Sequence, residues 1–327
     1  MADGLRLALV QANFCVGDIA GNQTMIIDAA RDASARLGAN VVVFPELAVT
    51  GYPPEDLVLK PAVWERAEAE LNRLAAATAG PGPAMLVGSI FREGDKLYNG
   101  IALLDGGHIK EVRYKVELPN YGTFDEKRLF TSGPMPDPVM FKGVKLGLPI
   151  CEDGWLPGVC EHLADCGAEL LISVNGSPEE IDKDDRRETE VFATRVRETG
   201  LPLIYLNMVG GQDDQVFDGG SFALNPGGAL AVQLPLFEDT VAHVDLHRGS
   251  EGWRVEDGPK AKTPDLLEQD YHAMVLGLRD YLRKSGFSKV LLGLSGGIDS
   301  AIVATIAADA IGAENVRCVM LPSDYTS

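Results

Sequence analysis

Residues 41–46 read VVVFPE, four apolar side chains in a row followed by a proline and a glutamate. A run that is apolar at every position predicts a short strand covered on both faces, because a half-exposed strand would alternate with polar residues. Glu46 then stands at the carboxyl end of that strand. A glutamate in such a place is by itself an ordinary loop residue, so a functional role for Glu46 depends on other residues of the chain.

The sequence on both sides of this run alternates between expected strands and helices. Strands are expected at residues 5–11, 41–44, 85–90, 98–104, 109–114, 144–150, 170–174, 203–207, 221–224 and 229–233. Helices are expected at residues 22–37, 62–78 and 184–199. Turn sequences at 105–108 (DGGH) and 225–228 (NPGG) predict hairpins. This pattern predicts an α/β fold with a mixed sheet or a pair of sheets.

The character of the chain changes after residue 245. Residues 246–264 are polar, contain Gly and Pro and show no clear period, so we expect a linker between a domain at 1–245 and a second one at 265–327. The second part is expected to contain helices at 265–284 and 301–310 and strands at 290–293 and 316–321. This order is typical of the start of a nucleotide-binding fold. Because such a sheet needs several strands to bury its faces, we expect these residues to form an incomplete domain.

Length and composition set limits on function. The 327 residues are enough for two domains. Asp and Glu number 48 against 29 Lys and Arg, and the net charge of −19 argues against nucleic acid or an anionic membrane as a partner. No stretch approaches the ~18 apolar residues of a membrane span, and no signal peptide is recognised. Five sparse cysteines without a CxxC motif predict no disulfide framework and a reducing, cytoplasmic location.

Cys160, His162 and Cys166 lie close together in the sequence, and all three side chains are possible zinc ligands. No fourth ligand follows at the spacing of a zinc finger. The sequence therefore predicts no metal site here.

Two further segments place a reactive side chain at or just past an apolar strand. Lys115 follows one strand, and Cys151 follows residues 147–150 (GLPI). Alone, each is an ordinary residue, a surface lysine and a small buried cysteine. With Glu46 they form a coherent set, in which Glu46 takes the thiol proton, Cys151 attacks an amide carbonyl and Lys115 stabilises the oxyanion. Glu46 could then protonate the leaving ammonia and activate the hydrolytic water.

The segments around these three residues resemble the catalytic blocks of the nitrilase, or carbon–nitrogen hydrolase, superfamily. The blocks read FPELAVTGYPPEDL at 44–57, YKVELPNYGTFDEKRLF at 114–130 and LPICEDGW at 148–155. In that superfamily a Glu-Lys-Cys triad cleaves carbon–nitrogen bonds through a thioester. The resemblance implies Glu46 as proton acceptor, Lys115 as oxyanion stabiliser and Cys151 as nucleophile. It also implies an α-β-β-α sandwich over residues 1–245.

Within the superfamily, the blocks are most similar to the glutaminase domain of bacterial glutamine-dependent NAD synthetases. This resemblance implies that Tyr121, Ser177 and Lys183 bind glutamine, and hydroxyls with a cation suit the two ends of an amino acid. The family usually reads Asn-Ala-Ser-Pro, followed by Phe and Gly-Lys, where this chain has NGSP at 175–178 and EEIDK at 179–183. Residues 218–221 (DGGS) also fit the family pattern, as structural support.

Residues 292–300 read LGLSGGIDS, between an expected strand and an expected helix. Small residues let backbone N–H groups approach a phosphate, and a helix N-terminus favours an anion. The stretch resembles the SGGxDS loop of ATP pyrophosphatases. That resemblance implies ATP contacts from Gly293, Leu294, Ser295, Gly296, Gly297, Ile298, Asp299 and Ser300. The last residues, LPSDYTS at 321–327, resemble the next block of NAD synthetases.

The order of these parts, amidase first and ATP loop second, implies a glutamine-dependent NAD synthetase, a carbon–nitrogen ligase. Glutamine hydrolysis would supply ammonia, and ATP with Mg2+ would adenylate deamido-NAD, whose AMP the ammonia displaces to give NAD. No tightly bound organic cofactor, nucleic acid or membrane is expected, and the resemblance implies a homo-oligomer. Two alternatives stay open: a stand-alone amidase or nitrilase with a vestigial tail, and an inactive scaffold that keeps an inherited site.

Overall fold

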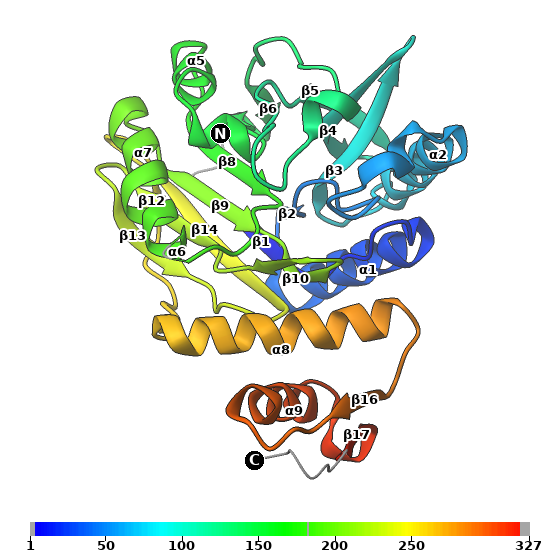
Figure 1. Cartoon of the computed structure of the whole chain (residues 1–327). Coiled ribbons are helices and arrows are strands. Elements are labelled where there is room, and N and C mark those ends of the chain that lie inside the picture. Colours follow the sequence, from blue (N-terminus) through cyan, green and yellow to red (C-terminus); the bar gives the residue numbers. More distant parts are fainter. Residues whose placement is uncertain (1–3, 182, 321–327) are drawn as a thin grey trace.

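Two β-sheets pack face to face with helices on their outer faces in the computed structural model, which describes residues 4–181 and 183–320 (Figure 1). Three clusters of buried apolar side chains fill the spaces between these layers. One lies between the sheets and includes Leu7, Val43, Leu146 and Ile172. The other two lie between each sheet and its helices. The expected α-β-β-α sandwich is therefore confirmed.

The first sheet has seven strands in the order β15-β14-β1-β2-β3-β4-β5. They are β1 (Gly4–Gln11), β2 (Val41–Val43), β3 (Ala84–Glu93), β4 (Lys96–Asp105), β5 (His108–Tyr114), β14 (Thr240–Gly249) and β15 (Gly252–Val255). β1, β2 and β3 run parallel, and the other neighbours are antiparallel. Because β2 lies inside this sheet, all three of its residues are buried, as the apolar run predicts.

The second sheet has six strands in the order β13-β12-β9-β8-β7-β6. They are β6 (Val139–Phe141), β7 (Val144–Gly147), β8 (Leu170–Asn175), β9 (Leu203–Asn207), β12 (Phe222–Asn225) and β13 (Ala229–Gln233). β7 ends three residues earlier than expected. Pro149 has no N–H to donate, and Ile150 forms only an isolated bridge with Val174.

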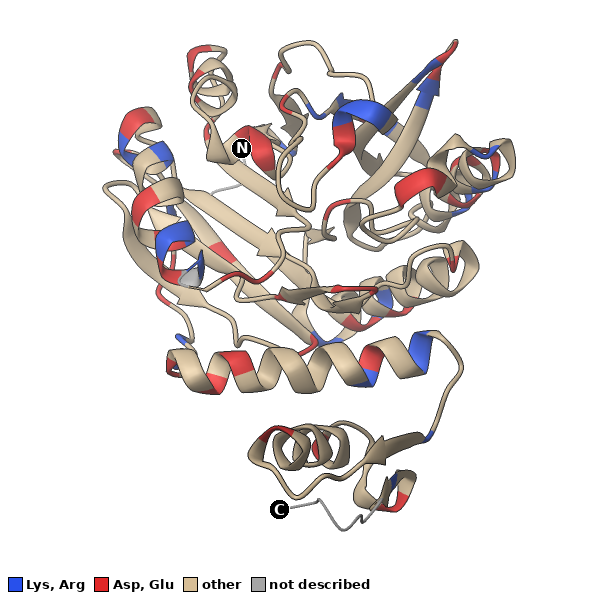
Figure 2. Cartoon of the chain, in the orientation of Figure 1, with Lys and Arg blue, Asp and Glu red and all other residues tan. Residues whose placement is uncertain are grey.

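The helices of the sandwich cover its two outer faces. The first sheet is covered by α1 (Ile19–Asp32), its π-helical continuation η1 (Ala33–Leu37) and α2 (Pro61–Ala77). The second is covered by α5 (Val159–Asp165), the π-helix η3 (Arg186–Phe192) and α7 (Ala193–Thr199). Short helices lie in the loops: η2 (Glu55–Leu59), α3 (Glu126–Leu129), α4 (Glu152–Trp155) and α6 (Lys183–Asp185). Figure 2 shows many of the charged residues on these helices and loops, while the inner strands β8 and β9 carry none.

The segment expected to be an irregular linker contains regular structure in its first half. The end of β14 and all of β15 lie within residues 246–255 and form a hairpin at the edge of the first sheet. The prediction of a linker there was wrong because β15 is only four residues long. Its alternation, with Trp253 and Val255 buried and Gly252 and Arg254 exposed, is too short to read as a period.

Beyond it, α8 (Leu266–Lys284) lies across the lower edge of the sandwich in Figure 1. It packs on a hairpin of β10 (Val209–Gln212) and β11 (Gln215–Asp218). Asp280 of α8 is fully buried and accepts hydrogen bonds from Asn13 Nδ2 at 2.5 Å and the Gly211 backbone at 2.8 Å. A Cβ added at Gly211 would lie 2.9 Å from Gly277 Cα, so glycine is needed for this close approach.

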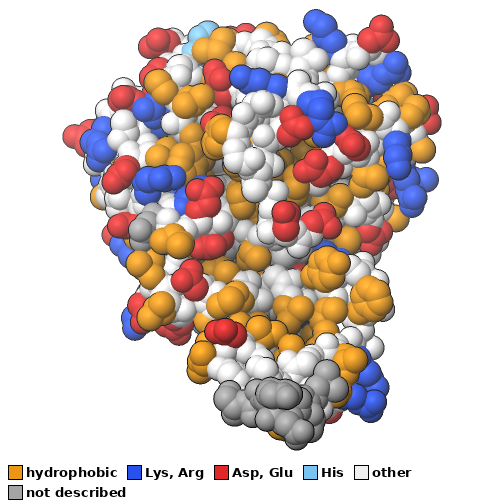
Figure 3. Space-filling view, in the orientation of Figure 1, with side chains coloured by type: hydrophobic (Ala, Val, Ile, Leu, Met, Phe, Trp, Pro, Cys, Tyr) orange, Lys and Arg blue, Asp and Glu red, His pale blue; other side chains and the backbone are white. Residues whose placement is uncertain are grey.

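The remaining elements form a small parallel unit, namely β16 (Val290–Gly293), α9 (Ile298–Ile311), η4 (Ala313–Asn315) and β17 (Val316–Val319). Its apolar side chains are largely exposed, including Leu291 at 71% and Ile298 at 72%. Figure 3 shows hydrophobic side chains gathered over this lower part of the molecule. The block expected at 321–327 lies outside the described residues. Among those described, no helix is both long and apolar enough to cross a membrane.

Candidate active site

Three strand ends bring Glu46, Lys115 and Cys151 into one buried site. Glu46 follows β2, Lys115 follows β5 and Cys151 follows β7. Lys115 Nζ lies 2.7 Å from Glu46 Oε1, and both side chains are 0% exposed. Cys151 is also buried, and the charges of Glu46 and Lys115 both act on its thiol. The structure thus brings together the three residues that the sequence singles out.

Cys151 occupies a sharp turn between β7 and α4. Its φ of 48° lies in the left-handed region, which a residue with a Cβ adopts only at a local energy cost. Its N–H donates to the Val174 carbonyl at 3.0 Å, and its carbonyl accepts from the Gly154 N–H at 2.9 Å. A nucleophile on a strained strand-to-helix turn is held out from the backbone in a fixed direction.

Burial raises the pKa of the Cys151 thiol well above its usual value, and the nearby charge of Glu46 adds to that rise, while Lys115 opposes it. The resting group is therefore the thiol. A thiol of this kind needs a neighbouring base to become a nucleophile.

The carboxylate of Glu46 is fixed by three donors. Oε1 accepts from Asn99 Nδ2 at 2.7 Å and from Lys115 Nζ, and Oε2 accepts from the Gly176 N–H at 2.8 Å. Gly176 stands where the family pattern has alanine. A Cβ at this position would lie 2.7 Å from Tyr52 Cδ1, so the packing of Tyr52 explains the glycine.

A second glutamate, Glu126 of α3, completes the surroundings of Lys115. Its Oε1 accepts from Lys115 Nζ at 2.9 Å and from the Tyr52 hydroxyl at 2.8 Å. Burial alone would lower the pKa of Lys115, but the carboxylates of Glu126 and Glu46 outweigh it and raise that pKa well above its usual value. Lys115 therefore stays a cation although its side chain is fully buried.

Glu126 itself has its pKa raised to about 6, because burial favours the neutral acid more than Lys115 favours the anion. The sequence analysis did not single this residue out. Its only local signal is a position eleven residues after Lys115 within the block at 114–130.

Asp153 ties the Lys115 segment to the Cys151 turn. Its Oδ1 accepts from the N–H groups of Val116 at 3.0 Å and Glu117 at 2.8 Å, and its Oδ2 accepts from the Ile150 N–H at 3.0 Å. Burial raises its pKa to about 7, against the effect of these N–H groups. Nothing local in the sequence indicates this connecting role of Asp153, because Val116 and Glu117 lie more than thirty residues away along the chain.

Two of the three residues expected to bind glutamine, Tyr121 and Lys183, lie near Glu152, which directly follows Cys151. The Tyr121 hydroxyl donates to the carboxylate of Glu152 at 3.0 Å, and Tyr121 lines a pocket of about 460 Å3. Lys183 Nζ lies 2.8 Å from Glu180 Oε1, and its charge opposes the rise that burial causes in the pKa of Glu152. Glu152, next to the nucleophile, is therefore the neighbour that Tyr121 and Lys183 share.

Ser177 is buried, next in sequence to Pro178 of this pocket, and its backbone is held by Asn207. The Ser177 N–H donates to Asn207 Oδ1 at 2.9 Å, and Asn207 Nδ2 donates back to the Ser177 carbonyl at 3.0 Å. Asn207 Nδ2 also donates to Asp218, which pairs with the guanidinium of Arg187 at 3.1 Å. These contacts of Asp218 agree with the supporting role expected for the 218–221 segment.

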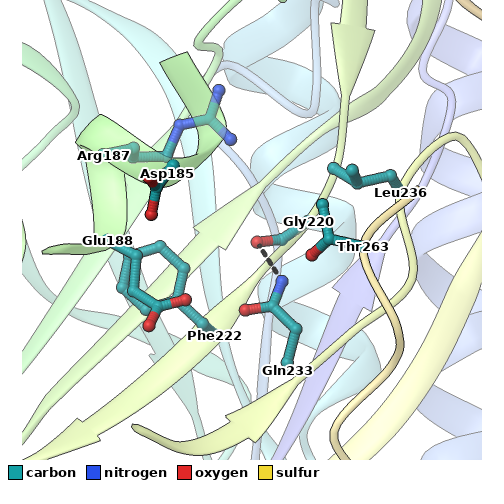
Figure 4. A pocket seen from close by; sticks show the side chains of 8 residues that line it. All are labelled: Asp185, Arg187, Glu188, Gly220, Phe222, Gln233, Leu236 and Thr263. Atoms are coloured by element: carbon teal, nitrogen blue, oxygen red, sulfur yellow. Dashed lines mark hydrogen bonds between the residues drawn. The ribbon is translucent and has the colours of Figure 1, made fainter. Parts of the chain in front are cut away.

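A further pocket of about 240 Å3 opens beside Arg187, between η3 and the β12–β13 hairpin (Figure 4). Gln233 donates to the Gly220 carbonyl within it at 3.1 Å. Thr263, from the segment that leads to α8, lines the same pocket.

The glycine-rich loop at 293–300 is built differently from the buried centre. It is largely exposed, and its two serines are hydrogen-bonded to each other, with Ser295 Oγ and Ser300 Oγ 3.0 Å apart. Ser300 Oγ also donates to the Gly297 carbonyl at 3.0 Å. A Cβ added at Gly293 or Gly296 would meet nothing within 4 Å. Open space therefore borders the loop at the N-terminus of the 14-residue helix α9.

Comparison with known proteins matches both parts of the chain. A family model described as "Carbon-nitrogen hydrolase" matches residues 6–253, and one described as "NAD synthase" matches residues 270–327. A curated protein from Rhodobacter capsulatus, "Glutamine-dependent NAD(+) synthetase", is 53% identical over 100% of this chain and 59% of its own length. The chain thus spans about 59% of the length of that relative.

Two kinds of solved structure are similar to this one. A glutamine-dependent NAD+ synthetase from Acinetobacter baumannii, in complex with ADP, has a TM-score of 0.93 at 36% identity, over 99% of this chain and 60% of that chain. An amidase of the nitrilase superfamily from Nesterenkonia has a TM-score of 0.67 at 28% identity, over 74% of this chain and 90% of that chain.

Proposed function

Because this chain belongs to the carbon–nitrogen hydrolase family, we propose that it hydrolyses glutamine and supplies the ammonia to an ATP-dependent synthesis of NAD. One observation carries the proposal. A buried Glu46–Lys115–Cys151 centre and an SGGIDS phosphate loop occur on the same chain, in that order. Relatives that share both parts are named glutamine-dependent NAD(+) synthetases, and the amidase from Nesterenkonia covers only 74% of the chain.

The first half of the reaction uses the thiol of Cys151. Glu46 takes its proton as the sulfur attacks the side-chain carbonyl carbon of glutamine, and the carbonyl oxygen becomes an oxyanion. Lys115, held as a cation by two carboxylates, stabilises that charge in a site without water. Glu46 then returns the proton to the leaving nitrogen, so that ammonia departs and a glutamyl thioester remains on Cys151.

The second half of the reaction restores the enzyme. Glu46 takes a proton from a water molecule, which attacks the thioester carbonyl, and Lys115 again faces the oxyanion. When the intermediate collapses, the carbon–sulfur bond breaks, the sulfur regains a proton and glutamate leaves. Each turnover therefore consumes one water and leaves Glu46 and Cys151 as they began.

Recognition of glutamine requires groups for both of its charged ends. Glu152 is a buried carboxylate that the Tyr121 hydroxyl already orients, and we assign it and Tyr121 to the α-ammonium group. Lys183 and the Ser177 hydroxyl are assigned to the α-carboxylate. Lys183 would exchange its present partner, Glu180, for the substrate. A pocket of about 460 Å3 beside Tyr121 has room for an amino acid.

The synthetase half is assigned to the loop at 293–300. Its exposed glycines border open space at a helix N-terminus, which fits a phosphate chain. Ser295, Ser300 and the N–H groups of Gly296 and Gly297 would bind the phosphates. The carboxylate of Asp299 is the oxygen donor that Mg2+ prefers, and Mg2+ bound with ATP would neutralise part of the phosphate charge. The acceptor is deamido-NAD, whose carboxylate is adenylated with release of pyrophosphate before ammonia displaces AMP.

We also assign the protein to the cytoplasm and to a homo-oligomer. The first assignment rests on five free cysteines and the second on the resemblance to nitrilase-like sandwiches.

The test is glutamate release from L-glutamine by the full-length protein, with and without ATP and deamido-NAD, beside Cys151→Ala. Glutamine-selective release that stops in the variant, with NAD formed in step, is the expected result. Hydrolysis of short amides without a preference for glutamine would replace the proposal with a stand-alone amidase. A folded protein whose Cys151 stays unreactive under all these conditions would instead indicate a scaffold.

A further inference from the structure

A cluster of three side chains with metal-binding atoms lies outside the site described above, at the upper edge of the second sheet. His162 and Cys166 are four residues apart at the end of α5 and share one face of its last turn, with Cys166 Sγ 3.5 Å from His162 Nε2. Asp137 comes from the segment before β6, which is close to α5 (Figure 1). The ligand atoms of the three residues all lie within 4.8 Å of one another.

We propose that Asp137, His162 and Cys166 bind a Zn2+ ion or a similar divalent transition metal. The sequence predicted no metal site here, because Cys160, His162 and Cys166 were the candidate ligands and no fourth ligand follows them at the spacing of a zinc finger. Cys160 is buried on the inner side of α5, where its Sγ contacts the Asp153 carbonyl at 3.9 Å. The third ligand comes instead from Asp137. It is 25 positions before His162, so the spacing of ligands in the sequence does not reveal it.

The distances suit a tetrahedral ion. Zinc bonds of about 2.3 Å to sulfur and about 2.0–2.1 Å to nitrogen, at a tetrahedral angle, set those two atoms about 3.6 Å apart. The observed separation of 3.5 Å between Cys166 Sγ and His162 Nε2 is therefore nearly that of a bound pair. Asp137 is exposed, so its carboxylate can rotate the remaining distance at little cost. A water molecule would take the fourth position.

The donor set also selects the class of metal. A thiolate and an imidazole favour zinc and its neighbours over Mg2+ or Ca2+, which take oxygen ligands. Cys166 binds as the thiolate, and its proton is released to solvent.

An ion in this place would join two segments that lead into the active site. α5 follows α4, which begins directly after Cys151. The backbone of Asp137 is held by Arg113, whose Nε donates to its carbonyl at 2.6 Å, and Arg113 lies in β5, two residues before Lys115. The metal would therefore stabilise the fold from outside the reaction, and it takes no part in the chemistry proposed above.

The experiment titrates Co2+ into metal-free full-length protein that carries Cys151→Ala, which removes the active-site thiol from the signal. We expect one tightly bound Co2+, with a dissociation constant in the micromolar range or lower, a thiolate-to-metal absorption band and the visible bands of tetrahedral cobalt. Zn2+ should displace it. Cys166→Ser should abolish the thiolate band and weaken binding by at least about 100-fold, and His162→Asn should weaken it similarly.

The matched control is Cys318→Ser, which removes an exposed thiol and should leave the titration unchanged. Circular dichroism of the metal-free variants verifies that each is folded. Because His162→Asn tests the site independently, the proposal stays decidable if Cys166→Ser does not fold. An unchanged thiolate band in Cys166→Ser, equal affinity in His162→Asn, or binding only at millimolar metal would overturn it.

Discussion

The buried centre around Cys151 and the loop at 293–300 represent two different ways of building a site. Around Cys151, the main charged groups are paired before substrate arrives: Lys115 lies between two carboxylates, and Glu46 has three donors. The loop is exposed, and its main side-chain contacts are between its own serines. The first site is rigid because the sandwich core surrounds it, whereas the second is carried by a two-stranded sheet with exposed apolar faces.

Because of this difference, removal of a charged side chain should affect different properties in the two sites. A charge removed from the buried centre leaves its partners unpaired in a medium of low dielectric constant, so both stability and activity fall. A charge removed from the exposed loop leaves only water behind, so activity alone should change. Substitutions in the full-length protein can test that contrast.

The largest effect is expected from Cys151→Ala. Loss of the nucleophile should lower glutaminase activity by roughly 10^4-fold or more, as for other covalent catalysts. The measurement is glutamate release from glutamine. NAD formation from free ammonia, ATP and deamido-NAD should persist, since the loop at 293–300 is untouched. Loss of both activities would show that the two sites do not separate in this way.

Lys115→Ala should destabilise the fold as well as stop hydrolysis. It leaves Glu46 and Glu126 as unpaired buried carboxylates, a change that costs roughly 3–5 kcal/mol in unfolding free energy. Denaturant unfolding at neutral pH measures it. Lys127→Ala, an exposed lysine on the same short helix as Glu126, is the matched control and should change stability by less than about 0.5 kcal/mol. Equal stability of the two variants would contradict the account of the site.

Asp153 predicts the sign of a pH effect. Its folded pKa of about 7 lies above the ordinary value of about 3.9, so the unfolded chain gives up this proton first as pH rises. Ionisation of Asp153 should therefore lower the free energy of unfolding, by an amount on the order of 3 kcal/mol, as pH rises from about 4 to about 7. Asp153→Asn should lower stability overall but remove that part of the slope. An unchanged slope across this window would mean that Asp153 is ionised throughout.

Asp299→Ala is expected to give the smallest effect, and one confined to the synthetase reaction. Loss of a carboxylate that would face the Mg2+ of bound ATP should lower NAD formation by roughly 10^2-fold. Because Asp299 is exposed, unfolding free energy should change by less than about 0.5 kcal/mol. Glutamate release without ATP, compared with wild type, is the control and should be the same. A large loss of stability here would contradict the contrast between the two sites.

The sequence predicted best what depends on local pattern. Apolar runs such as 41–44 and 170–174, the second broken only by Ser173, identified central strands. Glu46 and Cys151 attracted attention because each follows a short apolar run. Glu126 and Asp153 were missed because nothing in their neighbourhood distinguishes them from surface acids. Their importance arises only when folding brings Lys115 to Glu126 and the Val116 N–H to Asp153, each within 3.0 Å. Asp137 was missed for the same reason, since its neighbours on α5 are brought to it by the sheet.

The docking of α8 has a practical consequence for dividing this protein into parts. With Asp280 buried against Asn13 and Gly211, and Lys284 Nζ donating to the Gly211 carbonyl at 2.7 Å, α8 is mechanically part of the sandwich. A piece cut after β15 would lose the helix that packs on its β10–β11 hairpin, and Asn13 and Gly211 would lose their contacts with it. A piece cut after Ser285 would keep these contacts, so the natural place to separate the two proposed activities lies after α8.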